Sequence, residues 1–256
     1  MSPSPSGLVF EIQRWCTDDG PGIRSTIFFQ GCPLRCLWCC NPEAWCPAPV
    51  LDGGDPDHPL RGRRMAADEI LAVAVRDRVF YRRSGGGVTF SGGEPTTQPD
   101  LLEHLARRLR AEGIHLALET CGHFPWEPSA AALGLMDLVY LDLKHMDSAE
   151  HQRLTGVPNP LILDNAARLA AGGIPLVLRL PLIPGYNDDP RNLAATAGFA
   201  AHLGGPPIQV MPYHALGAGK YRALGLDYPL AALAPPAAES VDGARQALER
   251  CGASLV

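Results

Sequence analysis

The chain has 256 residues, of which 46% are hydrophobic and 19% charged, and its formal net charge is −5. This composition allows a sizeable core and argues against a disordered chain, and the acidic balance argues against a surface that binds nucleic-acid phosphates. No stretch approaches the apolar run that spans a membrane. Residues 1–6 lack the basic and apolar regions of a signal peptide, and we expect them to form a flexible N-terminus.

Taken in order, the sequence predicts strands that alternate with helices. Residues 24–30 are rich in β-branched and aromatic side chains and predict a strand, whereas the proline- and glycine-rich residues 41–64 predict an irregular connection. The other expected strands are 88–90, 114–119, 137–143, 176–182 and 208–211, and the expected helices are 68–83, 99–112, 126–135, 161–171, 192–203 and 237–250. Such alternation indicates parallel strands with right-handed crossovers, so we expect one α/β domain, either a partial barrel or a doubly wound sheet.

The loop after the first expected strand carries the most specific signal. Cys32, Cys36 and Cys39 are spaced C-x3-C-x2-C, and cysteine thiolates are the usual ligands of iron–sulfur clusters. Three cysteines leave one iron of a four-iron cluster open, and an open metal position can bind a substrate. The adjacent Cys40 is a candidate fourth ligand.

Other cysteines bear on the compartment. The chain has 8 cysteines and most lie between positions 32 and 46, which favours metal binding in a reducing cytoplasm over a disulfide framework. We expect Cys16, Cys121 and Cys251 to be buried as small apolar residues.

Polar residues follow the ends of successive expected strands, where parallel α/β folds place their active sites. These are Gly92, Gly93, Glu94, Glu119, Thr120, Asp142, Lys144, Arg179, Tyr213 and His214. Carboxylates could bind an ammonium group while Lys144 or Arg179 binds a carboxylate, so this set suits an amino-acid zwitterion. Trp38 either packs the loop or offers a stacking face to a flat base.

Two motifs together resemble the radical S-adenosylmethionine superfamily: Cys32-x3-Cys36-x-Trp38-Cys39 and Ser91-Gly92-Gly93-Glu94-Pro95. Four more stretches resemble, in particular, the activating enzymes of glycyl radical enzymes; they are DGPGIR at 19–24, DLK at 142–144, PGYNDD at 184–189 and PYH at 212–214. The resemblance implies a partial (β/α)6 TIM-like barrel, the radical SAM core. It also implies that a [4Fe–4S] cluster reductively cleaves S-adenosylmethionine, and that the 5′-deoxyadenosyl radical takes hydrogen from a glycine of a partner enzyme.

Carried to this chain, the resemblance assigns roles by position. It implies that Cys32, Cys36 and Cys39 bind the cluster and carry catalysis, and that S-adenosylmethionine contacts Gly92, Gly93, Glu94, Asp142, Lys144 and His214, beside Trp38. A monovalent cation would lie at Glu119, Thr120 and Asp142, although Glu119 stands where the family usually has Asp. Asp19 and Arg179 would contact the partner's glycine loop. A flavodoxin or ferredoxin would donate the electron in the cytoplasm, with no membrane or nucleic-acid partner.

Two alternatives remain open. The chain could be a radical SAM enzyme that modifies another peptide or a small molecule, or a non-enzymatic zinc or electron-carrier module with Cys40 or Cys46 as a fourth ligand. Residues 41–64 hold only Cys46, so no second cluster can form there. The chain therefore resembles the short activating enzymes without a ferredoxin-like insert, such as that of pyruvate formate-lyase.

Overall fold

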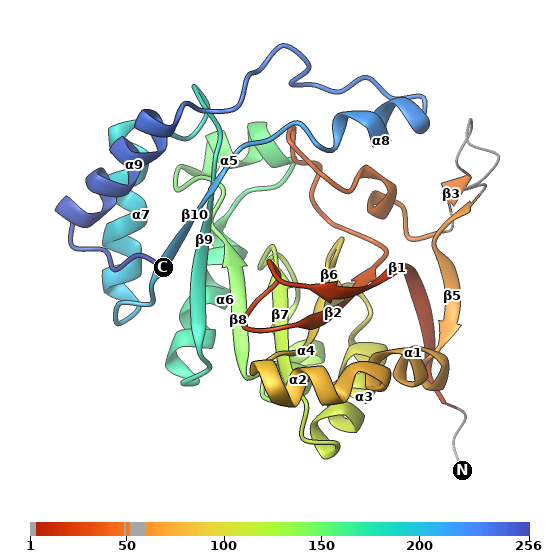
Figure 1. Cartoon of the computed structure of the whole chain (residues 1–256). Coiled ribbons are helices and arrows are strands. Elements are labelled where there is room, and N and C mark those ends of the chain that lie inside the picture. Colours follow the sequence, from red (N-terminus) through yellow and green to blue (C-terminus); the bar gives the residue numbers. More distant parts are fainter. Residues whose placement is uncertain (1–3, 49, 52–59) are drawn as a thin grey trace. The chain divides into compact units, whose positions relative to one another are not determined.

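The computed structural model describes residues 4–48, 50–51 and 60–256 (Figure 1). The chain divides into two compact units. Unit 1 comprises Met1–Pro33, Glu43–Thr120 and Phe124–Val139, and unit 2 comprises Leu34–Pro42, Cys121–His123 and Tyr140–Val256. Strand β8 (Leu138–Asp142) begins in unit 1 and ends in unit 2.

Parallel strands form the centre of unit 1. Strand β6 (Gly87–Gly92) pairs in parallel with β2 (Arg24–Phe29) on one side and with β7 (His115–Thr120) on the other. Hence Phe29, Gly92 and Thr120 all end their strands at one edge. The parallel pairing predicted for these three strands is confirmed.

Two antiparallel strands extend this sheet. Strand β1 (Ser6–Cys16) pairs with β2, and β5 (Arg63–Ala66) pairs with β1, which gives the order β5-β1-β2-β6-β7 in unit 1. Ser6 thus belongs to a strand rather than to a flexible N-terminus. The sequence did not predict β1, because only Gly7, Val9 and Cys16 of its eleven residues are buried, so the strand lacks apolar alternation.

The helices of unit 1 follow the expected segments with one break. The predicted helix 68–83 is divided into α1 (Ala67–Ala74) and α2 (Arg78–Ser84) by the 3-10 turn η2 (Val75–Asp77). Helix α3 (Pro99–Ala111) buries four leucines, each at most 2% exposed, namely Leu101, Leu102, Leu105 and Leu109. Burying each of these leucines stabilises the fold by roughly 1.5–3 kcal/mol. Helix α4 (Trp126–Leu133) completes the set.

The segment expected to be irregular contains short elements. These are the 3-10 turn η1 (Pro42–Trp45), the antiparallel pair β3 (Val50–Leu51) and β4 (Leu60–Arg61), and the start of β5. Another 3-10 turn, η3 (Pro95–Thr97), follows β6. Residues 49 and 52–59 of the expected connection lie outside the described residues.

Unit 2 repeats the strand–helix alternation. Strand β9 (Leu176–Leu182) lies between β8 and β10 (Ile208–Pro212) and runs parallel to β10. Helices α6 (Pro160–Ala171), α7 (Pro190–His202) and α9 (Ala238–Arg250) were predicted, whereas α5 (Ser148–Thr155) and α8 (Ala218–Ala223) were not. Both missed helices have eight residues or fewer, too short for a clear period of 3.6.

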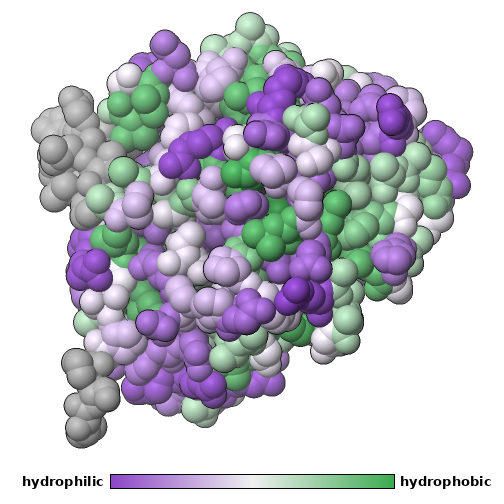
Figure 2. Space-filling model, turned by 180° about the vertical axis from the view of Figure 1, so that it is seen from behind, coloured by the Kyte–Doolittle hydropathy of each residue, from purple (hydrophilic) through white to green (hydrophobic). Residues whose placement is uncertain are grey.

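The C-terminus closes the edge of unit 2. The Ile208 amide donates to the Ser254 carbonyl at 2.8 Å, and the Val256 amide donates to the Ile208 carbonyl at 3.2 Å. Of the helices that the structure describes, none has the length and apolarity to cross a membrane. On the face that Figure 2 shows, hydrophilic and hydrophobic residues are interspersed.

Candidate functional site

The predicted site residues fall in both units. Unit 1 holds Asp19, Cys32, Gly92, Gly93, Glu94, Glu119 and Thr120, and unit 2 holds Cys36, Trp38, Cys39, Asp142, Lys144, Arg179 and His214. The boundary passes between Pro33 and Leu34, inside the cysteine loop.

In unit 1 the glycine turn is bonded to the start of the cysteine loop. The Gly93 amide donates to the Phe29 carbonyl and the Glu94 amide to the Gly31 carbonyl, each at 2.8 Å. A Cβ on Gly92 would lie 2.5 Å from the Phe29 backbone, and one on Gly93 would lie 2.3 Å from the Gly31 oxygen. Glycine is therefore required here by the close approach of the chain's own backbone.

Glu94 is a buried carboxylate that fixes this turn. Its side chain is fully buried and accepts from the Thr96 hydroxyl at 2.7 Å and from the Thr120 hydroxyl at 2.8 Å. The Thr96 amide donates to the same carboxylate at 3.2 Å, which caps η3. The carboxylate thus links the end of β7 to the turn that follows β6.

The residues predicted for a cation site have other partners within their own units. Glu119 accepts a hydrogen bond from the Ser91 hydroxyl at 2.5 Å, and Thr120 donates to Glu94, while Asp142 of unit 2 pairs with Lys144. Among the described residues, no three His, Cys, Asp or Glu side chains are grouped so as to hold a single metal ion.

Asp19 is held against the inner strands of unit 1. Its carboxylate accepts from the Thr26 hydroxyl at 2.5 Å, and its carbonyl accepts from the Thr89 hydroxyl at 2.8 Å. Thr89 also accepts from the fully buried guanidinium of Arg24 at 2.6 Å. The glycine-rich 19–24 stretch is thereby fixed on β2 and β6.

In unit 2 the second half of the cysteine loop is bonded to the end of α5. The Arg35 amide donates to the Thr155 carbonyl at 2.7 Å, and the Leu37 amide donates to the Leu154 carbonyl at 3.0 Å. These carbonyls belong to the last turn of the helix, where no intrahelical donor remains. An unpredicted helix therefore positions the segment that bears Cys36.

A buried ion pair lies beside Cys36. Lys144 Nζ is 2.7 Å from Asp142 Oδ2, with 8% of the lysine and 31% of the aspartate side chain exposed. Burial by itself lowers the pKa of Lys144, but the Asp142 carboxylate and then the Cys36 thiol outweigh it, so the pKa of Lys144 is raised. The lysine is therefore a permanent cation within electrostatic range of Cys36.

Buried asparagines hold Lys144 in place, a role that the sequence did not reveal. Asn187, in the PGYNDD stretch, donates to the Lys144 carbonyl at 2.9 Å and to the Pro181 carbonyl at 2.6 Å. Asn192 donates to the Asn187 carbonyl and accepts from the Met146 amide. The sequence shows these asparagines after β9, but only the structure shows that they hydrogen-bond to the backbone around Lys144.

Helix α8 and its approach hold the end of the cysteine loop. A Cβ on Gly217 would lie 2.7 Å from the Cys39 oxygen, and Lys220 donates to the Asn41 side chain at 2.7 Å. Cys40 Sγ lies 3.9 Å from the Trp38 carbonyl. The pKa of Tyr228 is raised, first by burial and then by its hydrogen bond with the Tyr213 phenol.

The remaining predicted residues of unit 2 differ in exposure. Arg179 is buried, with its guanidinium 3.9 Å from the centre of the Tyr140 ring and its Nε 2.9 Å from the Gln209 side-chain oxygen. Trp38 is buried and His214 is exposed.

No disulfide joins any of the eight cysteines, all of which lie in the described part of the chain. Cys16 and Cys121 are buried as predicted, but Cys251 is exposed, so that expectation is wrong for Cys251. Cys251 directly follows the last turn of α9 at the end of the chain, where little packs over it.

The Radical SAM superfamily pattern matches residues 26–197. The isethionate sulfite-lyase activating enzyme of Nitratidesulfovibrio vulgaris is 36% identical, over 88% of this chain and 90% of that protein. The benzylsuccinate synthase activating enzyme of Thauera aromatica is 35% identical, over 97% of this chain and 91% of that protein. The chain belongs to the radical SAM superfamily, among the activating enzymes of glycyl radical enzymes.

Solved structures agree with this family. A domain of the pyruvate-formate lyase-activating enzyme of Bacteroides vulgatus has a TM-score of 0.57 and 34% identity, over 67% of this chain and 98% of that one. The predicted fold class, the α/β radical SAM core, is confirmed, and the family implies a [4Fe–4S] cluster and S-adenosylmethionine as cofactors.

The curated relatives contain residues that this chain lacks. The alignment with the Nitratidesulfovibrio enzyme runs over 276 positions and that with the Thauera enzyme over 305, both more than the 256 residues of the chain. Each relative therefore carries internal insertions within the aligned region.

The donor set of the cysteine loop fits a cluster. Cys32, Cys36 and Cys39 have the C-x3-C-x2-C spacing, and none of them is in a disulfide. The thiolate is the form of cysteine that binds a metal. A four-iron cluster takes each cysteine on a different iron, so its ligands need not converge on one metal position as the ligands of a single zinc do.

Proposed function

We propose that Cys32, Cys36 and Cys39 bind the [4Fe–4S] cluster of this activating enzyme, and that Cys40 does not. The spacing of the three cysteines and the family membership support the assignment. When bound, the cluster and S-adenosylmethionine supply the 5′-deoxyadenosyl radical that takes hydrogen from a glycine of the partner. The match to the family spans residues of both units, which supports a single radical SAM domain.

Lys144 and Asp142 orient the methionyl end of S-adenosylmethionine. A cationic lysine next to a partly exposed carboxylate offers one charge to each end of a zwitterion. The backbone of Gly92, Gly93 and Glu94 receives the ammonium group. The buried Glu94 carboxylate holds this turn in place for that contact.

The other proposed roles follow the motifs. Exposed His214 contacts the ribose and Trp38 forms an apolar wall for the cofactor. Glu119, Thr120 and Asp142 hold a monovalent cation, which takes the place of their present hydrogen-bond partners. Asp19 and Arg179 contact the glycine loop of the partner. These assignments rest on sequence position within the family.

The partner is a glycyl radical enzyme, and the electron comes from a flavodoxin or ferredoxin in the cytoplasm. The relatives are named as activating enzymes of a sulfite-lyase, a dehydratase, a trimethylamine-lyase and a synthase, at 34% to 36% identity. Because these identities are nearly equal, the proposal names the class of partner rather than one member.

The test is radical formation on a partner enzyme. The chain is reconstituted anaerobically with iron and sulfide, reduced, and mixed with S-adenosylmethionine and purified candidate glycyl radical enzymes. We expect a glycyl radical signal by electron paramagnetic resonance with one of them, and 5′-deoxyadenosine as product. Cys36→Ala should abolish both, whereas Cys40→Ser should retain both.

Lys144→Met tests the binding role separately. This variant should keep its iron but bind S-adenosylmethionine at least tenfold more weakly, since it loses a charge-assisted contact. Arg153→Met, an exposed arginine on α5, is the matched control and should bind normally. An unchanged affinity in Lys144→Met would contradict the assignment.

A further inference from the structure

An exposed tryptophan in unit 1 is held in a strained backbone. Trp15 has φ +66°, and among the described residues no other residue besides glycine has positive φ. Such a conformation is unfavourable for a residue with a side chain and persists where surrounding contacts impose it. Here a β-bulge between Arg14 and Cys16 imposes it, and the Arg14–Asp77 ion pair at 2.5 Å anchors the bulge.

The strain presents an aromatic pair to solvent. Trp15 is 50% exposed, and its ring centre lies 4.2 Å from that of Phe80, which is 37% exposed. Val79 beside it is 52% exposed. Large apolar side chains that cluster on a surface commonly mark a site of protein association.

Arginines on the same helical face give this cluster a positive charge. Residues 75–84 are helical through η2 and α2, so Arg76, Val79, Phe80 and Arg83 share one face. Within the part of the chain that the structure describes, neither Arg76 nor Arg83 has a carboxylate within 4 Å. The Trp15 patch, defined as Trp15, Arg76, Val79, Phe80 and Arg83, is thus basic in a chain of net charge −5.

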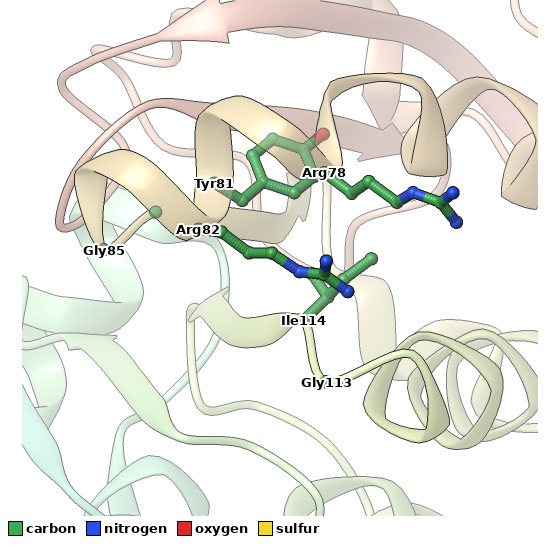
Figure 3. Close-up of a pocket in the computed structure, with 7 residues that line it drawn as sticks. Arg78, Tyr81, Arg82, Gly85, Gly113 and Ile114 are labelled. Atoms are coloured by element: carbon green, nitrogen blue, oxygen red, sulfur yellow. The ribbon is translucent and has the colours of Figure 1, made fainter.

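A small pocket lies on another face of α2 from the patch, and one of its arginines, Arg78, is 3.8 Å from the Glu112 carboxylate. It has a volume of about 190 Å³. Arg78 and Arg82 line it together with glycines at the end of α2 and the turn at Gly113 (Figure 3). Tryptophan and arginine are the residues most enriched among those that dominate binding energy at protein interfaces.

We propose that the Trp15 patch docks an acidic surface of the glycyl radical enzyme outside its glycine loop. The proposal rests on the proposed function for the partner's identity. Trp15 of the patch lies four residues before Asp19, which we assign to the glycine loop, so these two contacts are close along the chain. Positive charge on the patch selects an acidic partner surface and accelerates its encounter.

Two other occupants are disfavoured. A second copy of the chain would bring the arginines of two patches together, and like charges across an interface are repulsive. An electron donor must approach the cluster, but Cys16 pairs with Arg24 at one end of β2 and the cysteine loop follows Phe29 at the other. The five residue steps from Arg24 to Phe29 separate these ends by about 17 Å.

The test compares the partner enzyme with its own glycine-loop peptide. The partner is the enzyme that gives the glycyl radical signal with the wild-type chain. Trp15→Ser/Phe80→Ser and Arg76→Glu/Arg83→Glu should raise the half-saturating partner concentration about tenfold or more. Both should leave the rate at saturation, cleavage of S-adenosylmethionine without partner, and radical formation on the short peptide unchanged.

Matched controls sit elsewhere on the surface. Arg107→Glu/Arg108→Glu reverses two exposed charges on α3, and Leu161→Ser removes an apolar side chain that is 37% exposed; neither should change the half-saturating concentration. Anaerobic biolayer interferometry measures the affinity of each variant for the partner directly. Thermal unfolding of each variant shows whether a loss of affinity comes from misfolding.

Three results would overturn the proposal. The first is that both patch variants bind the whole partner as tightly as wild type. The second is that they lose as much activity on the short peptide as on the whole enzyme. The third is that the patch variants bind the partner normally but lose dimerisation or binding of the electron donor. Absence of a glycyl radical signal from the wild-type chain with every candidate would instead refute the proposed function.

Discussion

The carboxylate of Asp77 is buried beside the guanidinium of Arg14, with oxygen–nitrogen distances of 2.5 and 2.6 Å. The hydrogen bond from Arg14 holds the pKa of Asp77 below its ordinary value, against the opposing effect of burial. A carboxyl group whose pKa is depressed by folding stabilises the fold above its unfolded pKa, near 3.9. That stabilisation disappears as the pH falls through the folded pKa.

We therefore expect the free energy of unfolding to fall as the pH drops from about 5 towards 2, and to fall less steeply in Asp77→Asn. Urea titrations at a series of pH values measure both slopes. Asp68→Asn changes an exposed aspartate on α1 and should follow the wild-type curve. Parallel curves for wild type and Asp77→Asn would show that Asp77 does not carry this pH dependence.

Helix α5 links stability to the candidate cluster site. Asp147 caps it by accepting from the Ala149 amide at 2.9 Å and the Glu150 amide at 3.0 Å. The last carbonyls of the same helix accept from the cysteine loop. A helix that frays should therefore loosen the loop that carries Cys36.

Asp147→Ala should cost about 1 kcal/mol of stability and should release iron to a chelator faster than wild type. Asp147→Asn retains a capping oxygen and should restore both properties. Val241→Ala weakens α9, which packs on α7 and β10, and should lower stability without changing iron release. Equal rates of iron release in Asp147→Ala and wild type would show that α5 does not stabilise the cysteine loop.

The missed elements have a common physical cause. Helix α5 has eight residues, of which only His151, Leu154 and Thr155 are buried, so packing rather than periodicity forms it. Strand β1 forms because β2 and β5 flank it, although its own sequence alternates poorly. The long amphipathic helix α3 and the buried strand β9 were predictable because their burial repeats along the chain.

Across the whole molecule, the cysteine inventory limits the number of clusters. Outside the C-x3-C-x2-C loop the thiols are Cys16, Cys40, Cys46, Cys121 and Cys251, and no two of Cys16, Cys46, Cys121 and Cys251 are neighbours in the sequence. The chain also lacks the internal residues that its relatives carry.

We expect anaerobic reconstitution to give about four iron and four sulfide per chain, the content of one [4Fe–4S] cluster. Colorimetric iron and sulfide assays measure this content, and Cys46→Ser should leave it unchanged. A content near eight iron would mean that the remaining cysteines build a second cluster.

The sequence by itself determined the family, the cysteine loop and the order of the motifs, because these signals are contiguous: residue types at fixed short spacings need no knowledge of the fold. It also predicted that Gly92 and Gly93 contact a ligand, which stays a prediction; the structure adds that the backbone of Phe29 and Gly31 leaves no room for a Cβ at either position.

Only the tertiary structure decided what supports those residues. Lys220 meets Asn41 across 179 positions of sequence, and Asn187 meets the Lys144 carbonyl across 43. The strained Trp15 beside Phe80 is likewise a product of strand pairing and helix packing. Such contacts depend on how distant segments pack, so a local sequence pattern does not predict a contact with a residue that lies far along the chain.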